Sequence, residues 1–230
     1  MKYTPPNDSL QTLVDPLLPE SSFYQVGKTK LEGPHINDDD DIMSSVHHAQ
    51  VRVRSLKCKH DEMEFHAKRR VVTARDGACA LPYFLSNNQW KIILIEQFRI
   101  AVGKATLEAP GGVVENEENV LKTMARELEE EAGLKVQPDQ IELRFREYYL
   151  PSLLNGRAWG GIVEVNKKKH PGLDEPTLVR ERESGRDSYT VRRAYFLDEV
   201  LSLLGNNSLD VIDLWSARLI AEVAMVTREK

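Results

Sequence analysis

Four of the five residues from Glu127 to Glu131 are glutamates, and their spacing is the first sign of chemistry in this 230-residue chain. The apolar pattern around them predicts a helix over residues 119–132. Residues three and four apart share a helix face, so Glu127, Glu130 and Glu131 are expected to point the same way. Like charges at this spacing repel one another, and a divalent cation would cancel that repulsion. Three converging carboxylates therefore predict a site for Mg²⁺ or Mn²⁺.

The residues around the acidic run favour a metal-binding site. A solvated acidic helix is the alternative. The glycine pair Gly111–Gly112 allows a close approach of the backbone, so the Gly111 carbonyl can supply a further oxygen ligand. Arg126 lies four residues before Glu130 and is expected to steady that carboxylate without occupying the metal face. Gly133 is expected to end the helix as its C-cap. A merely solvated helix would predict none of these neighbours.

Composition narrows the classes of protein to which the chain can belong. Its 41% hydrophobic and 29% charged residues are typical of a soluble globular protein. A net charge of -5 argues against a general nucleic-acid surface, so no long nucleic acid is expected as a partner. No apolar run approaches the roughly 20 residues that span a bilayer, and residues 1–20 lack the apolar core of a secretory signal. These features predict a cytoplasmic protein with no membrane partner.

Hydrophobic periodicity indicates the elements that would position the acidic helix. Residues 46–75 alternate as strands and predict an N-terminal β segment, after a partly irregular extension over residues 1–45. Two buried strands, GACALPYFL and KIILIEQFR, are joined by the turn signal SNNQ. Residues 167–188 are predicted to be a polar loop, and the last helix is predicted to start with Ser208 as its N-cap. The order of strands, helix, strands and helices favours an α+β sandwich, with residues 76–230 as the main domain.

The stretch over residues 110–134 resembles the signature of the Nudix hydrolases at every fixed position. The matching residues are Gly112, Glu118, Arg126-Glu127-Leu128, Glu130-Glu131 and Gly133-Leu134. The resemblance implies an α/β/α sandwich with a mixed sheet, and hydrolysis of a nucleoside diphosphate linked to another group. It also implies that Glu127, Glu130, Glu131 and the Gly111 carbonyl hold Mg²⁺ (or Mn²⁺), with Glu131 taking part in catalysis. Glu118 matches a position whose role is supporting.

The flanking pieces LIEQFR and LEAPGG resemble the ADP-ribose pyrophosphatase branch, which acts on nucleoside diphosphate sugars. That resemblance implies that Arg99 contacts the diphosphate or the terminal ribose. A surface ion pair between Arg99 and Glu96 is the alternative. Glu108 is expected to hydrogen-bond the nucleoside side of the substrate, and Arg157 to contact a phosphate or a ribose.

One departure from the branch leaves room for another sugar nucleotide. Pro151 matches a proline that the branch carries after its signature. The Gly-rich turn expected to follow that proline is replaced here by residues 152–155, Ser-Leu-Leu-Asn. The signature therefore predicts the reaction type more sharply than the substrate.

The branch also takes a catalytic carboxylate from a loop between late strands. The matching loop, residues 167–188, offers Glu183 and Glu181, with Asp187 behind them, as the group that positions or deprotonates water. Solvated loop carboxylates are the alternative. The N-terminal sheet of the branch often pairs two subunits, which implies a homodimer in which Arg70 reaches the neighbour's substrate. An exposed strand charge is the other interpretation of Arg70.

The function expected from these residues is divalent-metal-dependent hydrolysis of the diphosphate linkage of ADP-ribose or a related nucleoside diphosphate sugar. The products would be a nucleoside monophosphate and a sugar phosphate. Other diphosphate substrates stay open: a dinucleoside polyphosphate, NADH, coenzyme A or a capped RNA end. A catalytically silent nucleotide sensor is a third class, and such a sensor need not keep every carboxylate of the signature, whereas this chain has them all.

Overall fold

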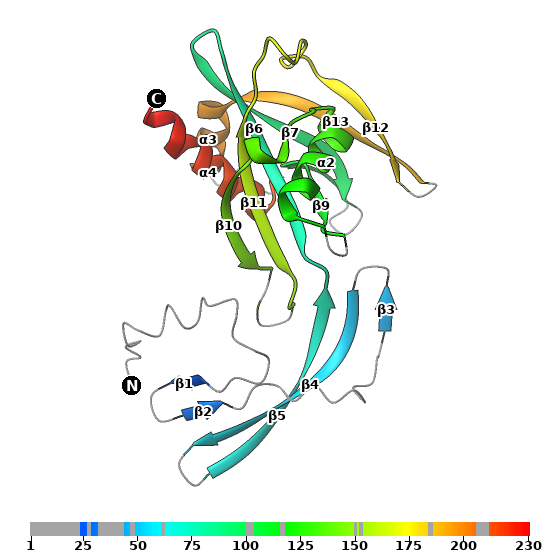
Figure 1. The fold of residues 1–230 in the computed structure, drawn as a ribbon, viewed down its shortest axis with the longest axis vertical. Coiled ribbons are helices and arrows are strands. Elements are labelled where there is room, and N and C mark those ends of the chain that lie inside the picture. Colours follow the sequence, from blue (N-terminus) through cyan, green and yellow to red (C-terminus); the bar gives the residue numbers. More distant parts are fainter. Residues whose placement is uncertain are drawn as a thin grey trace. The chain divides into compact units, whose positions relative to one another are not determined.

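The fold is seen in a computed structural model of the chain, which divides into two compact units (Figure 1). One unit comprises residues 1–74 with 150–155, and the other comprises residues 75–149 with 156–230. The structure describes residues 24–26, 29–31, 44–46, 49–60, 63–99, 104–115, 118–149, 151, 154–183, 186–205 and 212–230. None of the helices among these residues is long and apolar enough to cross a membrane.

The first unit is built on one long antiparallel pair. Strands β4 (Ala49–His60) and β5 (Met63–Ala74) pair from end to end, as their alternation of polar and apolar residues predicts. Three short strands extend this sheet: β1 (Tyr24–Val26), β2 (Thr29–Leu31) and β3 (Ser44–Val46).

The second unit contains a mixed eight-stranded sheet. Its main path runs β10-β11-β6-β7-β13-β12, with β8 paired to β7 and β9 paired to β6. The pairing of β11 with β6 is parallel and the others are antiparallel. The strands are β6 (Gly77–Ser86), β7 (Gln89–Arg99), β8 (Lys104–Glu108), β9 (Gly111–Val113), β10 (Glu142–Tyr148), β11 (Arg157–Glu164), β12 (Thr177–Glu183) and β13 (Arg186–Phe196).

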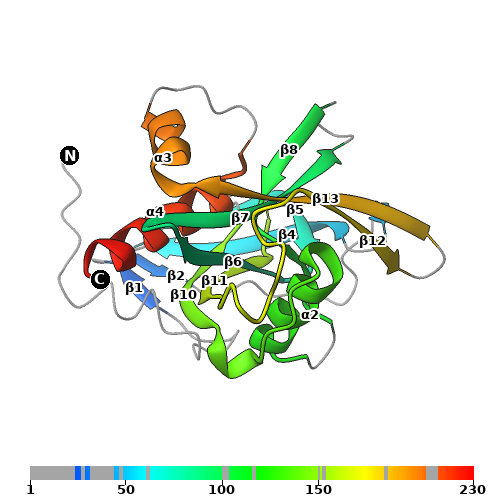
Figure 2. The same cartoon turned by 90° about the horizontal axis from the view of Figure 1, so that it is seen from above.

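Helices cover both faces of this sheet (Figure 2). Helix α2 (Val120–Ala132) packs on one face, and helices α3 (Leu197–Gly205) and α4 (Leu214–Arg228) pack on the other. A short 3₁₀ turn, η1 (Pro138–Gln140), follows α2. Strand β7 shows the division, because Ile93 belongs to the core under α2 while Ile92 belongs to the core under α3 and α4. The predicted α/β/α sandwich with a mixed sheet is confirmed.

Two local predictions were wrong. Part of the expected polar loop over residues 167–188 is strand β12, which pairs with β13 at the edge of the sheet. Edge strands tolerate charged residues, and the charged residues of β12 obscure the alternation of polar and apolar residues that predicts a strand. The last helix is capped by Asp213 rather than by Ser208, which lies outside the described residues. The predicted turn between β6 and β7 is present, with positive φ angles of 51° and 60° at Asn87 and Asn88.

Candidate active site around Gly111

Helix α2 fixes the acidic residues of the signature in place. Asn119 caps its N-terminus by accepting a hydrogen bond from the backbone N–H of Leu121 at 2.9 Å. Gly133 ends the helix in the left-handed conformation with a φ of 65°. The apolar face of the helix is anchored by Met124 and Leu128, which are fully buried. The predicted helix and both of its ends are confirmed.

Two of the predicted carboxylates pack against strand β9. Glu127 and Glu131 are each 5% exposed. An oxygen of Glu131 accepts a hydrogen bond from the backbone N–H of Gly111 at 2.8 Å. A Cβ atom at Gly112 would lie 2.2 Å from Oε1 of Glu127, so a larger residue there would displace this carboxylate from its present position. The structure therefore brings the glycine pair and these two glutamates together.

Arg126 occupies the acidic face more than the sequence predicted. Its Nη1 lies 2.7 Å from Glu127 and 2.8 Å from Glu130, and its Nη2 lies 3.4 Å from Glu118. The predicted contact with Glu130 is confirmed, but the expectation that Arg126 stays off the metal face was wrong, because its guanidinium also pairs with the buried carboxylate of Glu127. Burial would lower the pKa of Arg126, but the surrounding carboxylates outweigh burial and raise it.

Glu118 is held by the same guanidinium and by a hydroxyl. Its Oε2 accepts a hydrogen bond from Thr123 Oγ1 at 2.8 Å. Burial would raise the pKa of Glu118, but the hydrogen bonds from Thr123 and Arg126 outweigh it and the pKa is lowered. Glu118 thus links the start of α2 to the acidic face, which fits a supporting role.

The residues on this face fit a divalent cation by their chemistry. Within the described parts of the chain, no three His, Cys, Asp or Glu side chains stand close enough together to hold a metal ion as they lie. The donors are nevertheless carboxylate oxygens, which hard cations prefer. Arg126 supplies the positive charge that these carboxylates need in this arrangement.

A cavity of about 270 Å³ begins at the glycine pair. Its walls come from β6, β7, β8, β9, the end of β10, β11 and the start of α4. The lining residues are Gly77, Ala78, Cys79, Arg99, Glu108, Ala109, Gly111, Gly112, Val113, Tyr149, Ala158, Asp213, Trp215 and Ser216. Two predicted substrate contacts, Arg99 and Glu108, are among them.

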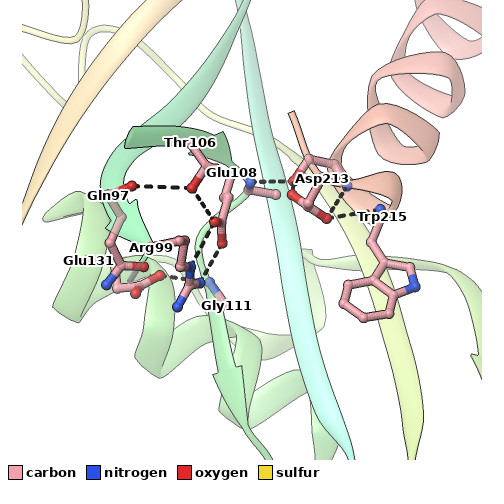
Figure 3. A network of polar contacts seen from close by, with 10 residues as sticks. Gln97, Arg99, Thr106, Glu108, Gly111, Glu131, Asp213 and Trp215 are labelled. Carbon is pink, nitrogen blue, oxygen red and sulfur yellow. Dashed lines mark hydrogen bonds and ion pairs between the residues drawn. The ribbon is translucent and has the colours of Figure 1, made fainter. Parts of the chain in front are cut away.

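Arg99 and Glu108 form a bidentate ion pair in this cavity (Figure 3). Nε and Nη2 of Arg99 lie 2.8 and 2.5 Å from the two carboxylate oxygens, and Thr106 Oγ1 donates to the same carboxylate at 2.6 Å. Burial would raise the pKa of Glu108, but these hydrogen bonds outweigh it and the pKa is lowered. The alternative pairing of Arg99 with Glu96 was wrong, since Glu96 pairs with Arg193 at 3.0 Å.

Four other predicted substrate and catalytic residues have no observed place in the cavity. Arg157 pairs with Asp76 through its Nε at 2.9 Å. Arg70 lies in β5, and Glu181 and Glu183 lie in β12, but their side chains are outside the described part of the structure. Their roles stay predictions.

Sequence reasoning missed the residues that helix α4 contributes to the cavity. Asp213, Trp215 and Ser216 line it, although they lie about 80 residues beyond the signature. The N-cap pattern of an aspartate before an amphipathic run was the available signal, but Ser208 offered a competing cap. Cys79 also lines the cavity, and burial raises the pKa of its thiol to about 12, which keeps it protonated.

Comparison with known proteins agrees with the signature. The NUDIX domain model matches residues 75–166. The methanol dehydrogenase activator of Bacillus methanolicus is 32% identical over 131 residues, which cover 55% of this chain and 69% of that protein. Nudix hydrolase 14, chloroplastic, of Arabidopsis thaliana is 33% identical over 95 residues, which cover 39% of this chain and 31% of that protein.

A solved structure shares the fold. The crystal structure of an ADP compounds hydrolase superposes with a TM-score of 0.59 at 12% identity, covering 90% of this chain and 97% of the other. At this identity the likeness concerns the fold alone. The motif, the family model and the relatives together show that the chain belongs to the Nudix family of hydrolases.

Proposed function

We propose that the chain hydrolyses the diphosphate linkage of ADP-ribose or a related nucleoside diphosphate sugar, with Mg²⁺ or Mn²⁺ as cofactor. The observation that carries this proposal is the place of Gly111. Its backbone N–H binds Glu131 of the acidic face, and the same residue lines the cavity that holds Arg99 and Glu108. A metal site and a site for an anionic substrate would therefore share one short strand.

The carboxylates of Glu127, Glu130 and Glu131, with the Gly111 carbonyl, would hold the cation. A bound Mg²⁺ offsets negative charge on phosphate oxygens and lowers the pKa of a bound water. Arg126, which pairs with Glu127 and Glu130, must then share these carboxylates with the cation while it keeps its contact with Glu118.

The remaining steps are assigned to side chains of the chain itself. Arg99, whose side chain is 48% exposed, would contact the diphosphate or the terminal ribose with the guanidinium donors that its pairing with Glu108 leaves over. Glu108 would hold Arg99 in place and hydrogen-bond the nucleoside side of the substrate. Glu183 or Glu181 would take a proton from the attacking water. The water oxygen bonds to one phosphorus as the bridging P–O bond breaks. A nucleoside monophosphate and a sugar phosphate are released.

The substrate class rests on the flanking pieces around Arg99 and Glu108. The structural neighbour is an ADP compounds hydrolase, which makes ADP-ribose the first substrate to test. The cavity of about 270 Å³ suits part of a nucleotide sugar, so the rest of the substrate would be bound elsewhere. A homodimer formed through the N-terminal β segment, with Arg70 reaching the neighbour's substrate, would supply that surface. A cytoplasmic location stays a prediction.

The test is a substrate panel with Mg²⁺ or Mn²⁺, followed by chromatography of the products. The panel contains ADP-ribose, UDP- and GDP-sugars, NADH, diadenosine polyphosphates and coenzyme A. We expect AMP and ribose 5-phosphate from ADP-ribose, or the corresponding pair from another nucleotide sugar. Faster turnover of NADH, a diadenosine polyphosphate or coenzyme A would replace the proposed substrate class. No turnover of any compound would contradict the hydrolase proposal and favour a nucleotide sensor.

A further inference from the structure

The start of helix α4 is tied to the segment that carries Glu108 and Gly111 (Figure 3). The backbone N–H of Ala109 donates a hydrogen bond to Ser216 Oγ at 2.7 Å, and the Ser216 hydroxyl donates in turn to the Asp213 carboxylate. Ile212, the residue before Asp213, forms an isolated parallel bridge with Leu107, the residue before Glu108. The backbone positions on either side of Glu108 are thus joined to residues more than 100 positions away in the chain.

Asp213 is an unusual helix cap because it lies in the wall of the cavity. It accepts hydrogen bonds from the backbone N–H groups of Trp215 at 2.9 Å and Ser216 at 3.1 Å, as an N-cap does. An N-cap carboxylate normally gains from the helix dipole and from solvent. Burial and the nearby Glu108 instead raise the pKa of Asp213, which lines the cavity wall. Asn119, which caps α2, is exposed and makes no comparable contact with the cavity.

The contact from Ser216 is one of three hydrogen bonds made by the backbone of Ala109, Pro110 and Gly111 outside the strand pairings. The Pro110 carbonyl accepts from the backbone N–H of Ala80 at 2.9 Å, and the Gly111 N–H donates to Glu131. Pro110 has no N–H to donate, so the amides on either side of it carry the donor contacts. Ser216 is 1% exposed, which leaves its hydroxyl little freedom to choose other partners.

We propose that Ser216 and Asp213 are positioning residues that set the direction of Glu108 and Gly111, so that helix α4 belongs to the substrate site. This inference rests on the proposed function, since Glu108 and Gly111 receive their roles there. It adds helix α4 to the site, although the match to the family model ends at residue 166. The proposal places no ligand at the N-terminus of α4, because the backbone N–H groups of Trp215 and Ser216 already donate to Asp213. The helix acts on the site through the hydrogen bond between Ala109 and Ser216.

The test compares two variants that each remove one hydroxyl from α4. Ser216→Ala removes the contact to Ala109, whereas Thr227→Val removes a hydroxyl that donates to Val223 and Ala224 at the other end of the helix. We expect Ser216→Ala to raise the KM about three- to tenfold, the cost of one hydrogen bond, with a smaller change in kcat. Thr227→Val should lower the Tm about as much as Ser216→Ala does but leave the KM unchanged. Asp213→Asn keeps a capping oxygen and should raise KM in the same direction with little change in Tm.

Amide hydrogen exchange provides a readout that needs no turnover. Positioning predicts faster exchange at Gly111 as well as at Ala109 in Ser216→Ala, although the Ser216 hydroxyl bonds to Ala109 and Asp213 and not to Gly111. Faster exchange at Ala109 alone, or an unchanged KM beside a lowered Tm, would make the pair an ordinary helix cap and overturn the inference. If the wild type turns over no substrate, the proposed function fails, while the exchange at Gly111 still decides for or against positioning.

Discussion

The two sides of Gly111 are built in different ways. On the α2 side, the charged contacts join near neighbours in the chain, such as Arg126 with Glu127 and Glu130. On the cavity side, the contact between Ala109 and Ser216 joins residues 107 positions apart. The α2 side is defined by helical spacing, and the cavity side is defined by the packing of α4 on the sheet. Chemistry that follows from local spacing can be read in a sequence, whereas chemistry that depends on distant contacts needs the fold.

The largest expected effect belongs to the α2 side. Glu131→Gln should lower kcat about 10²- to 10⁴-fold, the range for a positioned catalytic group, because the neutral amide cannot replace a charged oxygen ligand. The amide oxygen can still accept from Gly111, so the Tm should change little. The matched control is Glu129→Gln, since Glu129 is exposed on the same helix and pairs with Lys135 at 3.6 Å. Equal activity of the two variants would show that the face of the helix does not matter.

A smaller effect is expected on the cavity side. Arg99→Lys keeps the positive charge but loses the planar fork that pairs with both oxygens of Glu108. We expect the KM for the substrate to rise about tenfold and kcat to fall less, because one bidentate contact is lost. The comparable change of an arginine outside the cavity, Arg193→Lys, serves as the control. An unchanged KM in Arg99→Lys would remove Arg99 from the substrate site.

The smallest effect concerns stability and its dependence on pH. The pKa of Glu108 is lowered in the folded state below its usual 4.5, so its ionised form stabilises the fold above that value. This contribution is lost as the pH falls through the lowered pKa. The Tm difference between wild type and Glu108→Gln should therefore be present at pH 7 and shrink below about pH 4.5. A Tm difference for Glu108→Gln that stays constant over this pH range would contradict the role of its charge.

The sequence predicted the α2 side well because its determinants lie within one helix. The helix over residues 119–132 and its C-cap Gly133 were correct, and the glycine pair does approach the acidic face. The position of Arg126 was not predictable from helical spacing alone, since it depends on the buried Glu127. The cap of α4 was misplaced because Ser208 and Asp213 are both good capping residues. Contacts with Leu107 on strand β8 and with Ala109, just after that strand, accompany the choice of Asp213.

The central claim is that the carboxylates of α2 hold a divalent cation, and Mn²⁺ binding tests it without any substrate. Titration followed by the electron paramagnetic resonance signal of free Mn²⁺ would compare wild type, Glu127→Gln and Glu129→Gln, each checked for folding by its Tm. We predict that Mn²⁺ binds to wild type and to Glu129→Gln with equal affinity, and that Glu127→Gln weakens binding by about tenfold or more. Equal affinity in all three proteins, or no binding to the wild type, would contradict the account.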